Sequence, residues 1–136
     1  MREAFYTMNE NLSNKIKNNP FRKALGIRIY DVGEGKATAS LKTRDEHGNI
    51  HGFVHGAVMF AVCDAAFEAG VNSMDRPAVA VQVDIQYLSA AKVGDELTAH
   101  GIPVRIGRRM AAYRLELFNQ DGKLISVSQA TAFFTE

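Results

Sequence analysis

An aspartate stands in the most apolar stretch of the sequence. Asp64 lies within "GNIHGFVHGAVMFAVCDAAFEAGV", residues 48–71, most of which is alanine, valine, glycine and phenylalanine. Moving an ionised carboxylate out of water without a partner costs several kcal/mol or forces it to take up a proton. The sequence therefore leaves three interpretations of Asp64: it faces solvent, it has a structural partner, or it belongs to a site that uses it.

A glycine before Asp64 offers a second chemically useful group. From about His55 to Met74 the apolar residues have helical spacing, which places Gly56 in the first turn of a helix. Backbone N–H groups of a first turn have no partner within the helix and lie at the positive end of its dipole. Such a group can stabilise the oxyanion that forms during acyl transfer.

The spacing of these two residues limits how they could act together. Asp64 follows Gly56 by eight positions, so at ~1.5 Å per residue the two lie about 12 Å apart along the helix. If both groups act on one carbonyl, they must come from antiparallel helices of different subunits. The spacing then predicts a site at a dimer interface, with two such sites in each dimer.

The remaining sequence predicts the elements that position this helix. We expect one α+β domain over residues 1–136, which begins with an amphipathic helix at about residues 2–18 and continues with two short strands around the turn Gly33-Glu34-Gly35. Residues 44–54 are polar and predict a loop. After Pro77 come long runs with strand character, and the last contains a hairpin turn around Asp121-Gly122.

The predicted central helix is apolar on every side, so it should be surrounded by protein. Among so many strands, this requires an antiparallel sheet that wraps around the helix, which is a hot-dog arrangement. One sheet layer cannot cover the helix completely. We therefore expect a second copy to close the open side, giving a homodimer that pairs again into a dimer of dimers.

Composition excludes several classes of protein. Hydrophobic residues make up 46% and charged residues 23% of the 136 residues, which is typical of one globular domain rather than a disordered chain. The formal net charge of +1 gives no indication of nucleic acid or of a membrane surface. The single cysteine, Cys63, cannot form an internal disulfide, and the N-terminus lacks the apolar core of a signal peptide. We expect a cytoplasmic protein.

The spacing Asn-x-x-Gly-x-x-His-Gly, at Asn49, Gly52, His55 and Gly56, is followed by Asp64. This pattern resembles the hot-dog acyl-CoA thioesterases of the phenylacetate-degradation (PaaI-like) type. The stretches "VQVDIQYLSAAKVGDELTAHG" and "GRRMAAYRLELFNQDGKLIS" are similar to the later strands of that family. The resemblance covers about residues 24–134, and it implies an acyl-CoA substrate and no cofactor other than the coenzyme A of that substrate.

The resemblance also implies roles for single residues. Asp64 corresponds to the nucleophile or general base, and the Gly56 N–H to the group that polarises the thioester carbonyl. Asn49 would orient substrate or water, and His55 would support the start of the helix. One position departs from the family: Ala80 stands where many relatives carry a serine or threonine that holds the attacking water.

The sequence specifies the substrate-binding residues less clearly than the catalytic ones. Phe53, Val54 and Phe67 fit an apolar acyl pocket and fit core packing equally well, so aromatic and medium-chain acyl groups both stay open. Arg108 and Arg109, with the nearby Arg105, could bind the phosphates of coenzyme A. They could equally form a solvated strand end.

Other polar residues near Asp64 have simpler interpretations. Glu68 follows Asp64 by one turn, and we favour a solvated charge at the helix end over a second catalytic acid. His51 should lie at the surface or at a pocket rim, and Cys63 should be a buried, inert thiol facing the sheet. The spacing of His51, His55 and Asp64 matches no zinc motif, so we predict no metal.

Two other functions compete with hydrolysis. The first is a non-catalytic hot-dog protein that binds acyl-CoA, which the absence of a hydroxyl at Ala80 keeps open. The second is a hot-dog dehydratase or hydratase, but the pattern Asp-x-Asn-Pro-x-His that hydratase relatives carry is absent from the sequence. Release of free thiol from acyl-CoA distinguishes an enzyme from a binding protein.

Overall fold

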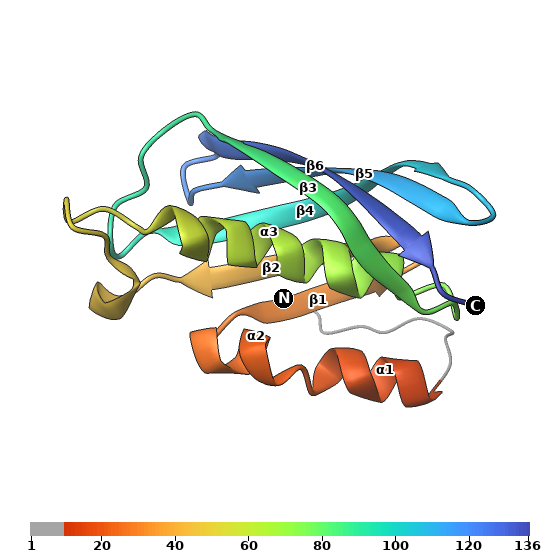
Figure 1. Ribbon diagram of the computed structural model, residues 1–136. Coiled ribbons are helices and arrows are strands. Elements are labelled where there is room, and N and C mark those ends of the chain that lie inside the picture. Colours follow the sequence, from red (N-terminus) through yellow and green to blue (C-terminus); the bar gives the residue numbers. More distant parts are fainter. Residues whose placement is uncertain (1–9) are drawn as a thin grey trace.

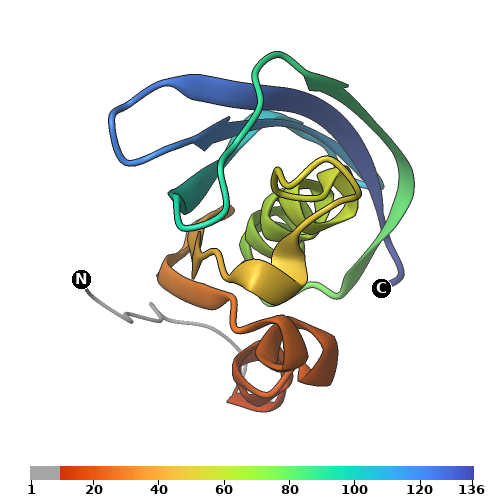
Figure 2. The same cartoon turned by 90° about the vertical axis from the view of Figure 1, so that its left-hand side faces the viewer.

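The structure, a computed structural model, describes residues 10–136. A six-stranded antiparallel sheet, in the order β1-β2-β4-β5-β6-β3, curves around the long helix α3 (Figures 1 and 2). The strands are β1 (Arg28–Gly33), β2 (Lys36–Lys42), β3 (Ala78–Tyr87), β4 (Glu96–Ile106), β5 (Met110–Phe118) and β6 (Leu124–Phe134). The helices are α1 (Glu10–Lys17), α2 (Pro20–Leu25) and α3 (Gly56–Val71), with a short 3-10 turn η1 (Asp45–His47). The predicted hot-dog architecture is confirmed.

The hairpins form where turn residues were predicted. Between β5 and β6, the Asn119 side chain accepts hydrogen bonds from the N–H groups of Asp121 and Lys123, both at 3.0 Å. Gly122 supplies the positive φ of 77° that this turn needs. On β5, buried residues alternate with more exposed ones, so one face of this strand belongs to the core.

The N-terminal segment differs from the prediction. Helix α1 ends at Lys17, close to the predicted end, while the predicted start lies outside the described residues. A second helix, α2, follows at Pro20–Leu25 and is absent from the prediction. Pro20 in fact occupies the first turn of α2, where its missing N–H is harmless. Asn19 caps this helix by accepting a hydrogen bond of 3.2 Å from the Arg22 N–H.

Small residues allow α3 to lie close to the sheet. A Cβ atom added to Gly70 would lie 3.0 Å from the Gly35 carbonyl oxygen and 3.3 Å from the Ala37 nitrogen. A Cβ atom at Gly101 on β4 would lie 3.1 Å from the Ala66 carbonyl oxygen of α3. Because these neighbours are backbone atoms, the helix and the sheet are in direct backbone contact at both places.

The helix is not covered on all sides within one chain. Its buried residues face the sheet, whereas Ala57, Phe60, Asp64 and Glu68 are exposed or half-buried. Their spacing of three or four positions places them on one stripe, which we call the open stripe. The expectation that one sheet layer cannot cover α3 is therefore confirmed, and the covering of its open side by a second copy stays a prediction.

We predict that Gly70→Ala destabilises the protein. Helix propensity alone would make this change favourable by ~1 kcal/mol. The new methyl group would meet backbone atoms that cannot rotate away, and overpacking of this kind typically costs about 1–3 kcal/mol. Urea unfolding should show a lower free energy of unfolding for the variant. A variant more stable than wild type would mean that helix and sheet separate easily here.

Candidate active site

The start of α3 leaves one backbone donor free. The His55 side chain caps the helix, since its Nδ1 accepts a hydrogen bond of 2.9 Å from the Ala57 N–H. The His55 carbonyl accepts from Val58 at 2.9 Å and from Met59 at 3.2 Å. Among residues 10–136 no acceptor lies within hydrogen-bonding range of the Gly56 N–H. Gly56 therefore presents the unused donor at the positive end of the helix dipole.

Tyr87, at the end of β3, holds the other side of Gly56. Its hydroxyl donates a hydrogen bond of 2.9 Å to the Gly56 carbonyl. A Cβ atom at Gly56 would lie 3.1 Å from Cζ of the Tyr87 ring and 3.2 Å from its hydroxyl oxygen. This contact could not be predicted from local sequence patterns, because it joins the start of the helix to a strand end 31 positions later.

Asn49 lies in the loop that leads into the helix. Its side-chain oxygen accepts hydrogen bonds from the N–H groups of His51, at 2.8 Å, and Phe53, at 3.1 Å. The oxygen is thus occupied with shaping the loop, while the amide N–H₂ has no acceptor among the described residues. His51 itself is exposed, as predicted.

A pocket of about 400 Å³ joins these groups, a size within the range of small-molecule sites. Its lining comprises Asn49, Phe53, Val54, Gly56, Met59, Tyr87, Leu88, Ser89 and Ala90. Two of the predicted substrate-binding residues, Phe53 and Val54, therefore lie beside Gly56. Phe67 does not. It is 1% exposed and packs its ring edge-on against Tyr113, with 5.3 Å between the ring centroids, so it is a core residue.

Asp64 is half-buried on the open stripe. It has no hydrogen bond or ion pair with any of the residues that the structure describes. Burial raises the pKa of its carboxyl group. Of the three interpretations of Asp64, the structural partner is therefore not supported, and a carboxylate kept free for a ligand fits its surroundings.

The neighbouring acidic and thiol groups behave differently from Asp64. Glu68 is exposed, as expected for a charge near the helix end, and in addition Asn19 Nδ2 donates a hydrogen bond to its carboxylate. Burial raises the pKa of Glu68, while the hydrogen bond from Asn19 lowers it. Cys63 faces β6, with its Sγ 3.8 Å from the Ser126 hydroxyl, and burial raises its thiol pKa to about 11. The prediction of a buried thiol that faces the sheet is confirmed.

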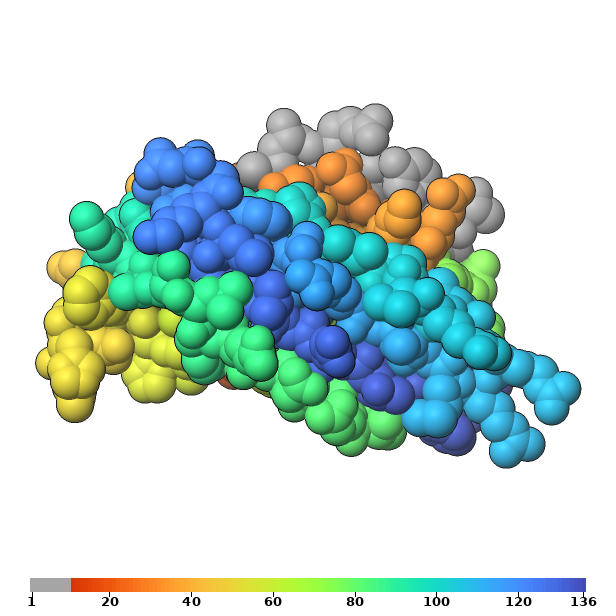
Figure 3. All heavy atoms as spheres, turned by 90° about the horizontal axis from the view of Figure 1, so that it is seen from above, coloured from red at the N-terminus to blue at the C-terminus, as the bar shows by residue number. Residues whose placement is uncertain are grey.

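The three arginines lie on the hairpin between β4 and β5, whose atoms project at one end of the outer face in Figure 3. Arg105, Arg108 and Arg109 are exposed and line a pocket of about 330 Å³. None of them forms an ion pair within residues 10–136. The hairpin is held in place by Arg76, which donates hydrogen bonds to the carbonyls of Gly107 and Arg108.

Residues 10–136 contain no cluster of histidine, cysteine, aspartate and glutamate side chains that could hold a metal ion. In the same range, no helix has the length and apolar character needed to cross a membrane.

Helix α3 of this hot-dog domain therefore carries an unused backbone N–H in its first turn and, eight positions further along, a carboxylate without a partner among the described residues, two groups suited to acyl transfer. The sequence profile of the thioesterase superfamily matches residues 51–126, which include both groups. The chain belongs to the thioesterase superfamily and is a thioester hydrolase.

Known relatives agree with this assignment. Acyl-coenzyme A thioesterase PaaI of Escherichia coli is 31% identical over 118 residues, covering 87% of this chain and 84% of that protein. The structure of E. coli PaaI matches with a TM-score of 0.88 at 29% identity, covering 93% and 92% of the two chains. A thioesterase structure from Streptococcus pneumoniae TIGR4, with coenzyme A, matches with a TM-score of 0.77 at 29% identity, covering 81% and 89%.

We predict that Tyr87→Phe slows turnover without unfolding the protein. The change removes only the hydroxyl that fixes the Gly56 peptide, and one such hydrogen bond is worth ~1 kcal/mol, or roughly a five- to tenfold change in kcat. KM and the unfolding midpoint should change little. The half-buried Tyr30 on β1 provides a matched control, since Tyr30→Phe should leave kcat unaltered. Equal rates for wild type and Tyr87→Phe would show that Gly56 is held by the helix alone.

Proposed function

We propose that this protein hydrolyses acyl-CoA thioesters at two equivalent sites in a homodimer. Each site would combine Asp64 of one subunit with Gly56 of the partner subunit. The observation that carries this proposal is that, among the described residues, the Asp64 carboxylate has no partner and the Gly56 N–H of the same helix has no acceptor. Within one helix the two groups are about 12 Å apart, too far to act on one carbonyl carbon.

The exposed surfaces of the chain support such a dimer. The open stripe runs along α3, and the sheet ends in β3, which pairs with β6 only. Val79 and Val81 on this edge strand are 51% and 54% exposed. A two-fold axis near Phe60, midway between positions 56 and 64, would bring each Asp64 opposite Gly56 of the partner subunit and cover these apolar side chains. Further pairing into a dimer of dimers stays a prediction.

The proposed chemistry needs one base and one oxyanion donor. Asp64 could take a proton from a water molecule that attacks the thioester carbonyl carbon, or its own oxygen could attack to form an anhydride that water then hydrolyses. In both routes the carbon–sulfur bond breaks, and coenzyme A leaves and gains a proton. The Gly56 N–H would stabilise the negative charge on the carbonyl oxygen.

Asn49 fits a supporting part in either route. Ala80 carries no hydroxyl, so another group must help to position the water. The Asn49 oxygen is occupied by the loop, which leaves its amide N–H₂ as a donor to water or to the substrate. Because Asn49 can only donate there, the proton of the water would have to go to Asp64.

The coenzyme A part of the substrate would lie toward the exposed arginines. Arg108 and Arg109 offer charges without ion-pair partners in the described chain, as phosphate groups require. A relative of the same fold has been solved with coenzyme A, which supports the same ligand here. The acyl group would be a small aromatic or medium-chain group, with Phe53 and Val54 on the wall of the pocket beside Gly56.

Asp64→Asn provides the test of the proposal. We expect at least a ~100-fold loss of kcat, the low end for acid–base groups, with little change in KM. The assay is release of free thiol across a panel of acyl-CoA esters. Asp121→Asn, in an exposed turn, serves as the matched control. Thermal stabilisation of wild type by acyl-CoA without thiol release would instead indicate a binding protein.

Asp64→Asn should also affect the stability of the folded protein. Burial disfavours the ionised form of Asp64 and raises its pKa in the folded state. Its ionisation therefore reduces stability as pH rises through the ordinary carboxyl range toward this raised pKa. At neutral pH, Asp64→Asn should unfold at the same or a higher temperature than wild type, so lost activity cannot be attributed to unfolding.

Mixing two inactive variants tests the shared site. Gly56→Ala should be impaired, because the added Cβ would meet the Tyr87 ring. In a mixed dimer with Asp64→Asn, one site carries both intact groups and the other carries both defects. With random exchange about half of the dimers are mixed, so about a quarter of all sites should recover activity. No recovery after verified exchange, or a monomeric mass by light scattering, would contradict the two-subunit arrangement.

A further inference from the structure

A buried histidine lies in the segment between β2 and α3 and has no part in the chemistry proposed above. His47 is the last residue of the turn η1 and is 2% exposed. Its Nδ1 accepts a hydrogen bond of 2.9 Å from the Arg44 N–H, and its own N–H donates to the Arg44 carbonyl at 2.9 Å. Because a ring nitrogen that accepts cannot also carry a proton, the ring is neutral and its proton lies on Nε2.

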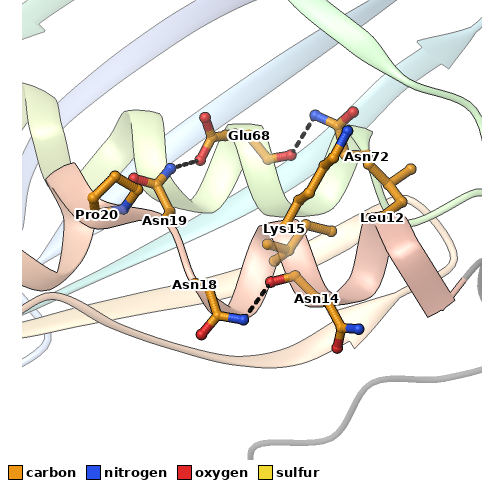
Figure 4. Close-up of a pocket in the computed structure, with 9 residues that line it drawn as sticks. Leu12, Asn14, Lys15, Asn18, Asn19, Pro20, Glu68 and Asn72 are labelled. Atoms are coloured by element: carbon orange, nitrogen blue, oxygen red, sulfur yellow. Dashed lines mark hydrogen bonds between the residues drawn. The ribbon is translucent and has the colours of Figure 1, made fainter.

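The Nε2–H of His47 is buried and has no acceptor among the described residues. In the pocket between the N-terminal helices and α3, by contrast, polar side chains are paired: Figure 4 shows Asn19 hydrogen-bonded to Glu68 and Asn72 hydrogen-bonded to the Glu68 backbone. A buried donor without an acceptor costs free energy that an apolar side chain of similar size does not. A histidine is therefore unfavourable here unless its Nδ1 contributes something that an apolar side chain cannot.

The backbone of His47 joins the turn η1 to the start of α3. The His47 carbonyl accepts a hydrogen bond of 2.8 Å from the His55 N–H. His55 in turn accepts from the second, third and fourth N–H groups of the helix, which leaves the Gly56 N–H as the unused donor. The contact between the His47 ring and Arg44 fixes the turn, and the turn sets the direction of the carbonyl that holds His55.

Backbone contacts with the loop before β4 hold the two ends of this segment. The N–H and the hydroxyl of Thr43 donate to the Asp95 carbonyl at 3.0 and 2.7 Å, and the Val54 N–H donates to the Ala91 carbonyl at 2.9 Å. Between these two anchors, the contacts of His47 connect the turn to the helix. The position of the helix start therefore depends on the shape of η1 as well as on the anchors.

We propose that His47 is a positioning residue for the reaction: its unprotonated Nδ1 holds η1 in the shape that seats His55 and directs the Gly56 N–H toward the substrate carbonyl. The inference rests on the proposed function, because it takes Gly56 as the oxyanion donor. His47 itself touches neither the substrate nor the attacking water. Loss of the Nδ1 contact should lower kcat and leave KM nearly unchanged, because a misdirected donor weakens the transition state more than the bound substrate.

A matched pair of variants tests the proposal. Glutamine at this position of a turn can accept from the N–H at the start of the turn, as in a capping box, so His47→Gln keeps an acceptor. Methionine is equally long and has no such acceptor, so His47→Met loses the contact. We expect His47→Met to lower kcat roughly five- to tenfold with KM within about twofold, and His47→Gln to keep at least about half of the wild-type kcat. His100→Met, at an exposed position on β4, is the control and should match wild type.

Urea unfolding of the same variants distinguishes positioning from a purely structural part. His47→Met removes a buried unpaired donor, whereas His47→Gln buries an amide, so His47→Met should be the more stable variant and the slower enzyme. If kcat instead follows the unfolding free energies of the two variants, or if His47→Met keeps the wild-type kcat, the proposal is overturned. A folded His47→Gln protein with a loss of kcat of roughly fivefold or more would overturn it as well, even if His47→Met does not fold.

The NMR signal of the Gly56 amide separates this inference from the proposed function. Its chemical shift should move in His47→Met and stay near the wild-type value in His47→Gln. That result, together with no thiol release by the wild-type protein, would overturn hydrolysis and not the positioning. An unmoved Gly56 signal in folded His47→Met would overturn the positioning, whatever the activity.

Discussion

The structure depends on how much of one helix a single curved sheet can cover. Helix α3 is apolar enough to require burial over nearly its whole surface. Six strands and the small residues Gly70 and Gly101 bring the sheet into backbone contact with it on one side. The opposite side keeps the open stripe, on which Asp64 lies half-buried.

Hydrogen bonds within the described residues occupy all but one of the backbone donors in the first turn of α3. A helix N-terminus normally offers several free donors, which water would occupy. Here the His55 side chain takes one of them and the His55 carbonyl takes the next two, which leaves the Gly56 N–H. Tyr87 then fixes the carbonyl of the same residue. A donor held in this way need not reorganise when charge develops on a carbonyl oxygen, which is how preorganised sites stabilise oxyanions.

The sequence was sufficient for those features that depend on local pattern. Strand alternation predicted the sheet, helical spacing predicted α3, and the position of Asp64 among apolar residues singled it out. Features that depend on contacts between distant segments were not predictable. Proline can end a helix or begin one, so Pro20 did not reveal α2, and Glu68 acquired its environment only because α2 brings Asn19 beside it. From the sequence, Phe67 suited an acyl pocket and the core equally well. The structure shows that it lies on the side of α3 that packs against the sheet, where it contacts Tyr113.

The two carboxylates of the open stripe, Asp64 and Glu68, have different surroundings, and this difference affects what each group can do. Burial raises the pKa of both, but only Glu68 has an amide donor and a nearby arginine that favour its ionised form. Asp64 has neither, so its negative charge is the less compensated of the two. A carboxylate with uncompensated charge gains most from taking up a proton or binding an electrophile, whereas one held by a donor gains most from accepting a further hydrogen bond. In the proposed mechanism, this less compensated charge makes Asp64, rather than Glu68, the group that acts at the thioester carbonyl.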